Sequence, residues 1–245
     1  MKSLSLYVLL LPAFYSAYAI TCFISKWWYR AKSKRASLKP TKLFETLFEN
    51  HISEVFTNQS LATLTKIKEQ TIKSLCKKPP EPLLLVFLAP SEAKSTAITL
   101  AKRLVQITLT SKNKMSLPWS ATDRLLMKGS AFANITSPWR FYEVIKEKIA
   151  TNSHLIITEF EMIHPHSAAL LIFMSKELFF PEKEVHLYLI VEIPSIHLSN
   201  TVNALNHWMK TRLVSHLEPE LLQETQRALY LRTCLIKSED VSVVE

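Results

Sequence analysis

The sequence predicts an α/β domain built around a mainly parallel central sheet. A continuous apolar run at residues 83–89 and two mainly apolar segments, at residues 154–158 and 185–193, have the length and composition of buried strands. The segments between these runs return to a helical period of apolar residues. The chain has 245 residues, of which 48% are hydrophobic, and this is enough for one sizeable core. We therefore expect one domain with an N-terminal appendage.

The N-terminal appendage is predicted to be a transmembrane helix. Residues 4–25 contain no charged residue, and as a helix they would extend about 33 Å, close to the thickness of a bilayer core. Two tryptophans and a tyrosine follow, and such rings favour the membrane–water interface. We expect an anchor over residues 1–29 and a basic juxtamembrane linker over residues 30–40. The alternative is a signal peptide, because Ala17-Tyr18-Ala19 resembles a cleavage site.

Two features disagree about which side of the membrane holds the body of the chain. The basic residues after the span favour a cytosolic body. Two glycosylation sequons, at Asn58 and Asn134, would suit a lumenal one. The body contains only two cysteines, Cys76 and Cys234, which a lumenal compartment would allow to form a disulfide. Two buried free thiols are the alternative.

The body, residues 41–245, is predicted to begin with two helices. Leucine, isoleucine and phenylalanine recur at helical spacing over residues 41–57, and a second helix is expected over residues 60–76. A cluster of prolines then breaks the chain, because proline lacks the N–H that a helix interior requires. The strand at residues 83–89 follows, and helical periodicity returns over residues 91–108.

The second half of the body continues the alternation of helices and strands after a stretch that we expect to be irregular, residues 109–135. Each later strand lies between two expected helices, and an apolar stretch closes the domain. The expected helices are 138–150, 166–178, 199–215 and 219–227, and the last apolar stretch is 228–236.

The chain contains one glycine, Gly129, although an average chain of this length would have about 17. Dinucleotide-binding turns, intact phosphate loops and the nucleophile elbow of α/β hydrolases each need several glycines at fixed spacing. All three motifs are therefore excluded.

The turn after the strand at 83–89 nevertheless has the context of a phosphate loop. It reads Leu88-Ala89-Pro90-Ser91-Glu92-Ala93-Lys94-Ser95 and opens a helix, so Lys94 and Ser95 stand where such a loop would end. Leu88 and Ala93 replace its glycines, and Glu92 adds a negative charge where phosphates would lie. The pattern indicates a degenerate phosphate loop; the alternative is an ordinary strand-to-helix turn with a solvated lysine.

The strand at 154–158 ends like an altered Walker-B motif. Such a motif places one acid toward Mg²⁺ and a second toward the attacking water. Here Thr158 stands at the metal position and Glu159 at the second, and a hydroxyl is a poor substitute for a carboxylate as an Mg²⁺ ligand. The alternative is a pair of polar residues at the end of a strand.

Together these segments resemble a known family. IITEFEMIHPH resembles the Walker-B region of torsins, and VHLYLIVEIPS, followed by a long helix, is similar to the torsin-activating cofactors of the lamina-associated polypeptide type. The segment LLQETQRALYL at residues 221–231 resembles the ending of that family, in which an arginine completes the ATP site of the torsin. By this match Arg227 is the candidate arginine finger.

The resemblance implies an AAA+-like three-layer sandwich, preceded by one transmembrane helix, that binds neither nucleotide nor metal. It implies a lumenal domain in the endoplasmic reticulum or nuclear envelope membrane, in a hetero-oligomer with a torsin-type AAA+ ATPase that it activates. Two alternatives remain: a divergent torsin-like ATPase that uses Lys94 and Glu159, and a structural membrane protein without a nucleotide role.

Other classes of site have little support in the sequence. His154, His164 and His166 fit no zinc-binding spacing, and we expect them in loops or helix caps. The net charge of +9 is concentrated beside the predicted span, where anionic headgroups are the nearest partner. No aromatic-basic pattern of RNA recognition is present, and we expect no nucleic-acid partner.

Overall fold

The computed structural model describes residues 40–77, 82–113, 118–174, 185–195 and 200–239. Residues Thr41–Glu245 form one compact unit, which contains every strand of the sheet. The transmembrane helix expected over residues 1–29 lies outside the described residues, as does all of the basic linker except Pro40. No helix in the described part of the chain is long and apolar enough to cross a membrane.

The predicted α/β class and parallel sheet are confirmed. Five strands are ordered β2-β3-β4-β1-β5, and each pairs in parallel with its neighbour. All residues of β1 and β3 are buried, because helices cover both faces of the sheet. The bounds are Leu83–Ala89 for β1, Leu126–Lys128 for β2, His154–Thr158 for β3, His186–Glu192 for β4 and Thr233–Leu235 for β5.

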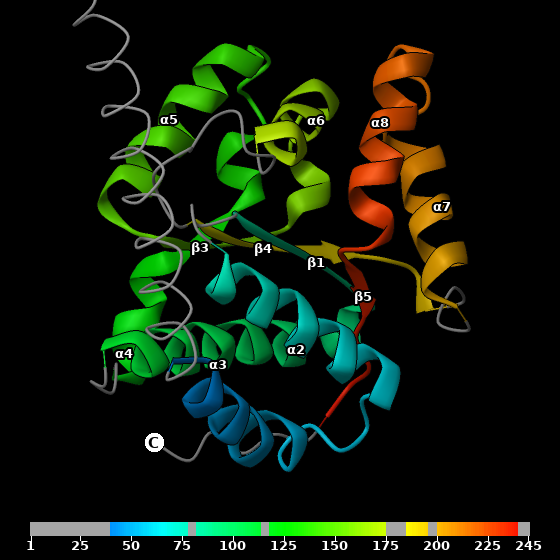
Figure 1. Cartoon of the computed structure of the whole chain (residues 1–245). Coiled ribbons are helices and arrows are strands. Elements are labelled where there is room, and N and C mark those ends of the chain that lie inside the picture. The colour runs from blue at the N-terminus through cyan, green and yellow to red at the C-terminus, as the bar shows by residue number, and fades with distance from the viewer. Residues whose placement is uncertain (1–39, 78–81, 114–117, 175–184, 196–199, 240–245) are drawn as a thin grey trace, which may run out of the picture. The chain divides into compact units, whose positions relative to one another are not determined.

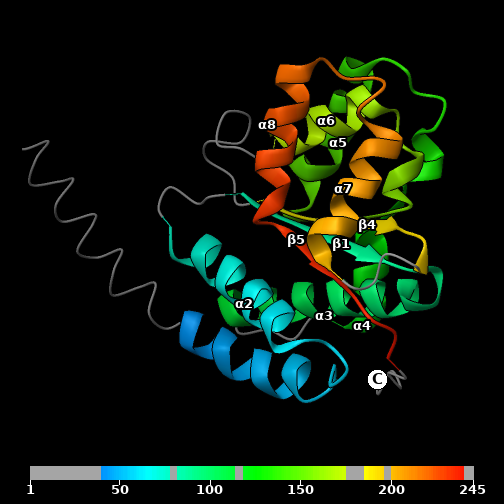
Figure 2. The ribbon, with the colours of Figure 1, turned by 90° about the vertical axis from the view of Figure 1, so that its right-hand side faces the viewer.

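The helices form a layer on each face of the sheet (Figures 1 and 2). The helix at residues 40–48, which continues as the π-helix η1, lies on one face with α2, α3 and α4, and α5 to α8 lie on the other. Side-chain caps fix several helix starts: Ser60, Ser137 and Asn200 each accept a backbone N–H. The bounds are Glu49–Ser53 for η1, Leu61–Cys76 for α2, Lys94–Asn113 for α3, Trp119–Thr122 for α4, Pro138–Thr151 for α5, Pro165–Met174 for α6, Thr201–Arg212 for α7 and Pro219–Tyr230 for α8.

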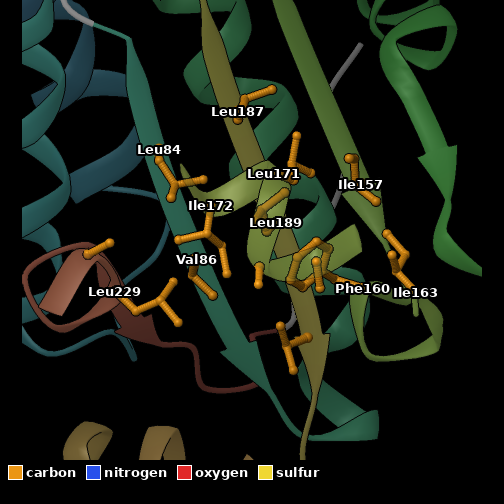
Figure 3. Close-up of a cluster of buried hydrophobic side chains, with 14 of the residues drawn as sticks. Leu84, Val86, Ile157, Phe160, Ile163, Leu171, Ile172, Leu187, Leu189 and Leu229 are labelled. Atoms are coloured by element: carbon orange, nitrogen blue, oxygen red, sulfur yellow. The ribbon is translucent and has the colours of Figure 1, made fainter. Parts of the chain in front are cut away.

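Alternate residues of each strand enter two separate hydrophobic cores, as the two-residue period of a strand requires. Leu84 and Val86 of β1 point toward α6 and α8, where they meet Leu171 and Leu229 (Figure 3). Leu85 and Phe87 point to the opposite face and pack with the helices of the N-terminal half. Burial on both faces explains the continuous apolar runs that predicted the strands.

The prediction of an irregular stretch at residues 109–135 is wrong. Helix α3 continues to Asn113, and α4, β2 and two 3₁₀ turns, η3 (Asp123–Leu125) and η4 (Gly129–Phe132), follow. β2 has three residues, which is too short to display a periodic pattern. The last apolar stretch, residues 228–236, divides between the end of α8 and the edge strand β5. The end of the helix expected at 166–178 lies outside the described residues.

Candidate functional site

A cavity of about 610 Å³ lies beyond the carboxyl ends of β1, β3 and β4. In parallel α/β sheets this edge is where ligands bind. The turn after β1 forms a short 3₁₀ turn, η2 (Ser91–Ala93), in which Ala93 is fully buried, and α3 then begins at Lys94. Lys94 lines the cavity, whereas the neighbouring Ser95 is exposed and is not part of the lining.

Lys94 is held by carboxylates of the same chain. Its Nζ donates a hydrogen bond to Glu192 Oε2 at 3.2 Å and lies 3.7 Å from Glu159 Oε1. Burial alone would lower the pKa of Lys94, but the hydrogen bond and charge of Glu192, with the charges of Glu159 and Glu161, raise it above its ordinary value. Lys94 is therefore a protonated lysine with its counter-ions already in place.

The lining of the cavity carries net negative charge. Among the described lining residues Lys94 is the one cation, and it faces the three carboxylates of Glu159, Glu161 and Glu192. Burial raises the pKa of Glu161, although the backbone N–H of Glu192 donates to its Oε2 at 3.0 Å and opposes that rise. A nucleotide polyphosphate would meet a field of its own sign here.

Glu159 is fixed by an unusual backbone conformation. Its φ of 54° makes it the one non-glycine residue with positive φ in the described part of the chain, and a glutamate there carries some strain. The hydroxyl of Ser130 donates to its Oε2. This hydrogen bond, followed by the charges of Lys94 and Lys128, outweighs the effect of burial and lowers the pKa of Glu159.

The single glycine of the chain packs directly against this residue. A Cβ at Gly129 would lie 2.0 Å from the carbonyl oxygen of Glu159 and 2.7 Å from its carbonyl carbon, both far inside van der Waals contact. In the sequence Gly129 served only to exclude motifs, and its structural role was missed. Ser130 was missed as well, because no local pattern links it to a residue 29 positions later.

Thr158, expected at the metal position of an altered Walker B, is not in the cavity lining. It is buried, and its hydroxyl donates to the carbonyl oxygen of Met127 in β2 at 3.3 Å. Its polar atom thus joins two strands instead of facing a ligand. Within the residues that the structure describes, no cluster of three or more histidine, cysteine or acidic side chains could hold a metal ion.

Arg227 lies apart from this cavity. It is in the last turn of α8, which ends just before the first residue of β5, so it is near the amino end of the sheet and away from Lys94. Its side chain is exposed, and it makes no hydrogen bond or ion pair with the described residues. By contrast, Arg212 of α7 donates to the carbonyl oxygen of Glu161.

The disulfide considered between Cys76 and Cys234 is not formed. Both thiols are free, with Cys76 exposed at the end of α2 and Cys234 buried in β5. The alternative of two buried thiols is also wrong for Cys76. Both sequon asparagines are exposed, although the side-chain amide of Asn58 donates to the carbonyl oxygen of Ser238 at 3.3 Å.

The histidines are arranged differently from the expectation of loops and caps. His154 is the first residue of β3, fully buried, and its ring centroid lies 4.5 Å from that of His186 at the start of β4. His164 and His166 do lie at the start of α6, with rings stacked 5.5 Å apart. The sequence missed the buried pair because the two residues meet only through strand pairing.

The chain matches no protein-family model, and no curated protein matches it. The features that bear on its function are therefore the acidic cavity around Lys94 and the exposed guanidinium of Arg227.

Proposed function

We propose that the chain is a non-catalytic, membrane-anchored activator with an AAA+-like domain, which binds a torsin-type AAA+ ATPase and supplies Arg227 to its ATP site. The observation that carries this proposal is the contrast between two cations. Lys94, where a nucleotide-binding lysine would stand, is neutralised by its own chain, whereas Arg227 makes no hydrogen bond or ion pair with the residues that the structure describes. The chain thus has an occupied phosphate position and an available arginine.

The AAA+-like assignment is supported by the arrangement of the sheet. β4 is inserted between β1 and β3, and the degenerate phosphate loop joins β1 to α3. This order places the ends of β1 and β3 on either side of β4, so that Lys94 and Glu159 face the same cavity. This arrangement supports the proposal of a nucleotide-site architecture that lacks its glycines.

The surroundings of Arg227 are suited to a protein interface. Tyr230 and Leu231 follow it by three and four residues, which places them beside it on the exposed face at the end of α8. Their side chains are 48% and 67% exposed. Arginine and tyrosine are prominent among the residues that dominate binding energy at interfaces. A guanidinium beside apolar anchors could be held in a neighbouring ATP site, where it would stabilise charge on the transferred phosphoryl group.

The decisive experiment measures the ATPase activity of a torsin-type partner with the full-length chain in detergent. Arg227→Ala should reduce the stimulated rate by about 10³-fold or to the unstimulated level, since arginine fingers contribute about 10³–10⁵. Arg227→Lys should restore little, because an ammonium lacks the bidentate geometry. Arg140→Ala, which removes an exposed arginine of α5, is the matched control and should stimulate like the unmodified chain. Full stimulation by Arg227→Ala would exclude the finger.

The second candidate is a divergent ATPase, and one observation favours it. Lys94 and Glu159 line the same cavity, 3.7 Å apart, as a phosphate-binding lysine and a water-orienting acid could. ATP hydrolysis by the chain alone, lost in Lys94→Ala, would establish this function in place of the activator role.

The proposed topology places the domain in the lumen of the endoplasmic reticulum or nuclear envelope. The exposure of Asn58 and Asn134 is compatible with glycans on a folded lumenal domain. A mobility shift after endoglycosidase treatment of the chain from membranes, lost when both asparagines are changed to glutamine, would support it. A cytosolic domain would show no shift.

A further inference from the structure

The amino end of α3 is a place where an anion would be stabilised. Helix N-termini direct unpaired N–H groups and the positive end of the helix dipole outward, and Lys94 adds a full positive charge there. The ammonium group of Lys94 is already met by oxygens of the chain itself, since Glu192 Oε2 and Glu159 Oε1 lie 3.2 Å and 3.7 Å from its Nζ.

These two carboxylates come from different strands and are positioned by different contacts. Glu159 follows β3, and the left-handed backbone and the hydroxyl of Ser130 direct it. Glu192 ends β4, where its N–H is bonded to Glu161. Lys94, which follows the turn after β1, thus contacts one carboxylate at the end of β3 and one at the end of β4. The cavity beside it has a volume of about 610 Å³.

We propose that Glu159 and Glu192 form an internal anion that occupies the phosphate position at Lys94 and thereby closes the cavity to polyphosphates. The turn without glycine is then only part of the barrier, and the other part is electrostatic and reversible. This barrier belongs to the chain's own cavity and goes beyond the activator proposal. It would exist even if Arg227 entered no ATP site of another protein.

The test neutralises both carboxylates while keeping their shape. Glu159→Gln/Glu192→Gln in the full-length chain removes both ion-pair partners of Lys94, leaves Glu161 in place, and reduces the negative charge of the lining by two. Inorganic tripolyphosphate and a fluorescent ATP analogue serve as probes, without Mg²⁺. We expect at least tenfold tighter binding than by the unmodified chain, and loss of that gain when Lys94→Met is added.

The matched control is Glu143→Gln/Glu147→Gln, which removes the same charge from two exposed acids of α5. It should leave binding unchanged, so a similar gain in this variant would overturn the proposal as a general charge effect. A double variant at the cavity that binds no better than the unmodified chain, or whose gain survives Lys94→Met, would also overturn it.

If the double variant does not fold, Glu192→Gln alone, at the more exposed of the two carboxylates, should still give a gain of several-fold. No gain there would equally reject the proposal. None of these results depends on stimulation of a partner, which tests Arg227 separately.

Discussion

The parallel strands begin at one side of the sheet, here called the amino edge, and end at the other, the carboxyl edge. Ionisable side chains at these two edges are in opposite states. At the carboxyl edge, Lys94 keeps its charge among carboxylates in an open cavity. At the amino edge, His154 and His186 are buried without charge, because burial lowers the pKa of both, to about 3 for His186, and the charge of Lys112 lowers them further. The contrast indicates that the carboxyl edge keeps its lysine charged among carboxylates, whereas the amino edge keeps its two histidines neutral.

Acid should therefore destabilise the domain through the amino edge first. Both histidines have an ordinary pKa of 6.5 when unfolded and a lower pKa when folded, so the folded state binds fewer protons. Their contribution to stability is complete above about pH 6.5 and is lost as the pH falls below it. Between pH 7 and pH 5 each ring should cost about 2 kcal/mol, and the pair about 4 kcal/mol, of the free energy of unfolding. Thermal and denaturant unfolding of the full-length chain across this range measures the loss.

Variants separate the two edges in this pH range. His186→Gln should reduce the acid-dependent loss by about half, to about 2 kcal/mol, whatever its effect at pH 7. His51→Gln, at an exposed histidine of η1, should leave the loss unchanged. The pKa of Glu159 lies below its ordinary value of 4.5, so the carboxyl edge should lose this contribution only below that pH. An unchanged pH dependence in His186→Gln would show that the buried pair is not responsible.

A substitution at Gly129 should disturb the carboxyl edge. Gly129 does not have positive φ, so alanine is compatible with its backbone, and the whole cost comes from contact. Its Cβ would collide with backbone atoms of Glu159, which cannot move aside as a flexible side chain could. We expect Gly129→Ala to lower the free energy of unfolding by about 3 kcal/mol.

A second variant at the same place calibrates this effect. Ser130→Ala removes the hydrogen bond to Glu159 without a collision and should cost about 1 kcal/mol. A smaller effect for Gly129→Ala than for Ser130→Ala would contradict the close approach of the two backbones. Denaturant midpoints of the two variants provide the comparison.

The sequence could predict features that depend on neighbouring residues, but not contacts between residues that are distant in the sequence. The sequence predicted that Lys94 opens the helix after β1 and that Glu159 follows β3, as the structure has them, because the order of strand, turn and helix is a local pattern. The contact between Lys94 and Glu192 spans 98 positions and depends on the pairing of β1 with β4, which sets Ala89 opposite Glu192. The pocket's charge balance therefore could not be derived before the strand order was known.

The role of the one glycine also depends on contacts between segments that are distant in the sequence. β2 is three residues long and has no detectable periodicity, so the sequence did not reveal that Gly129 follows a strand paired with β3. The buried histidines were missed for the same reason, since only the register of β3 and β4 brings them together. The sequence predicted the local turns, but it could not predict contacts that depend on the order of the strands.

Arg227 has the smallest expected effect on stability, because its side chain is exposed on the last turn of α8. Its guanidinium makes no hydrogen bond or ion pair within the described part of the chain, and alanine is the better helix former. We expect Arg227→Ala to change the free energy of unfolding by less than about 0.5 kcal/mol. Arg212→Ala, which removes a hydrogen bond to the carbonyl oxygen of Glu161, should cost about 1 kcal/mol.

Unchanged stability in Arg227→Ala gives its functional test a clear meaning. A loss of ATPase stimulation in a variant that unfolds like the unmodified chain must come from the missing guanidinium, since the domain that presents it is intact. A destabilisation of more than about 1 kcal/mol would instead place Arg227 in a structural contact within the domain. An arginine used internally would be a poor candidate for completing a neighbour's site, so this measurement of stability bears on the activator proposal before any partner is added.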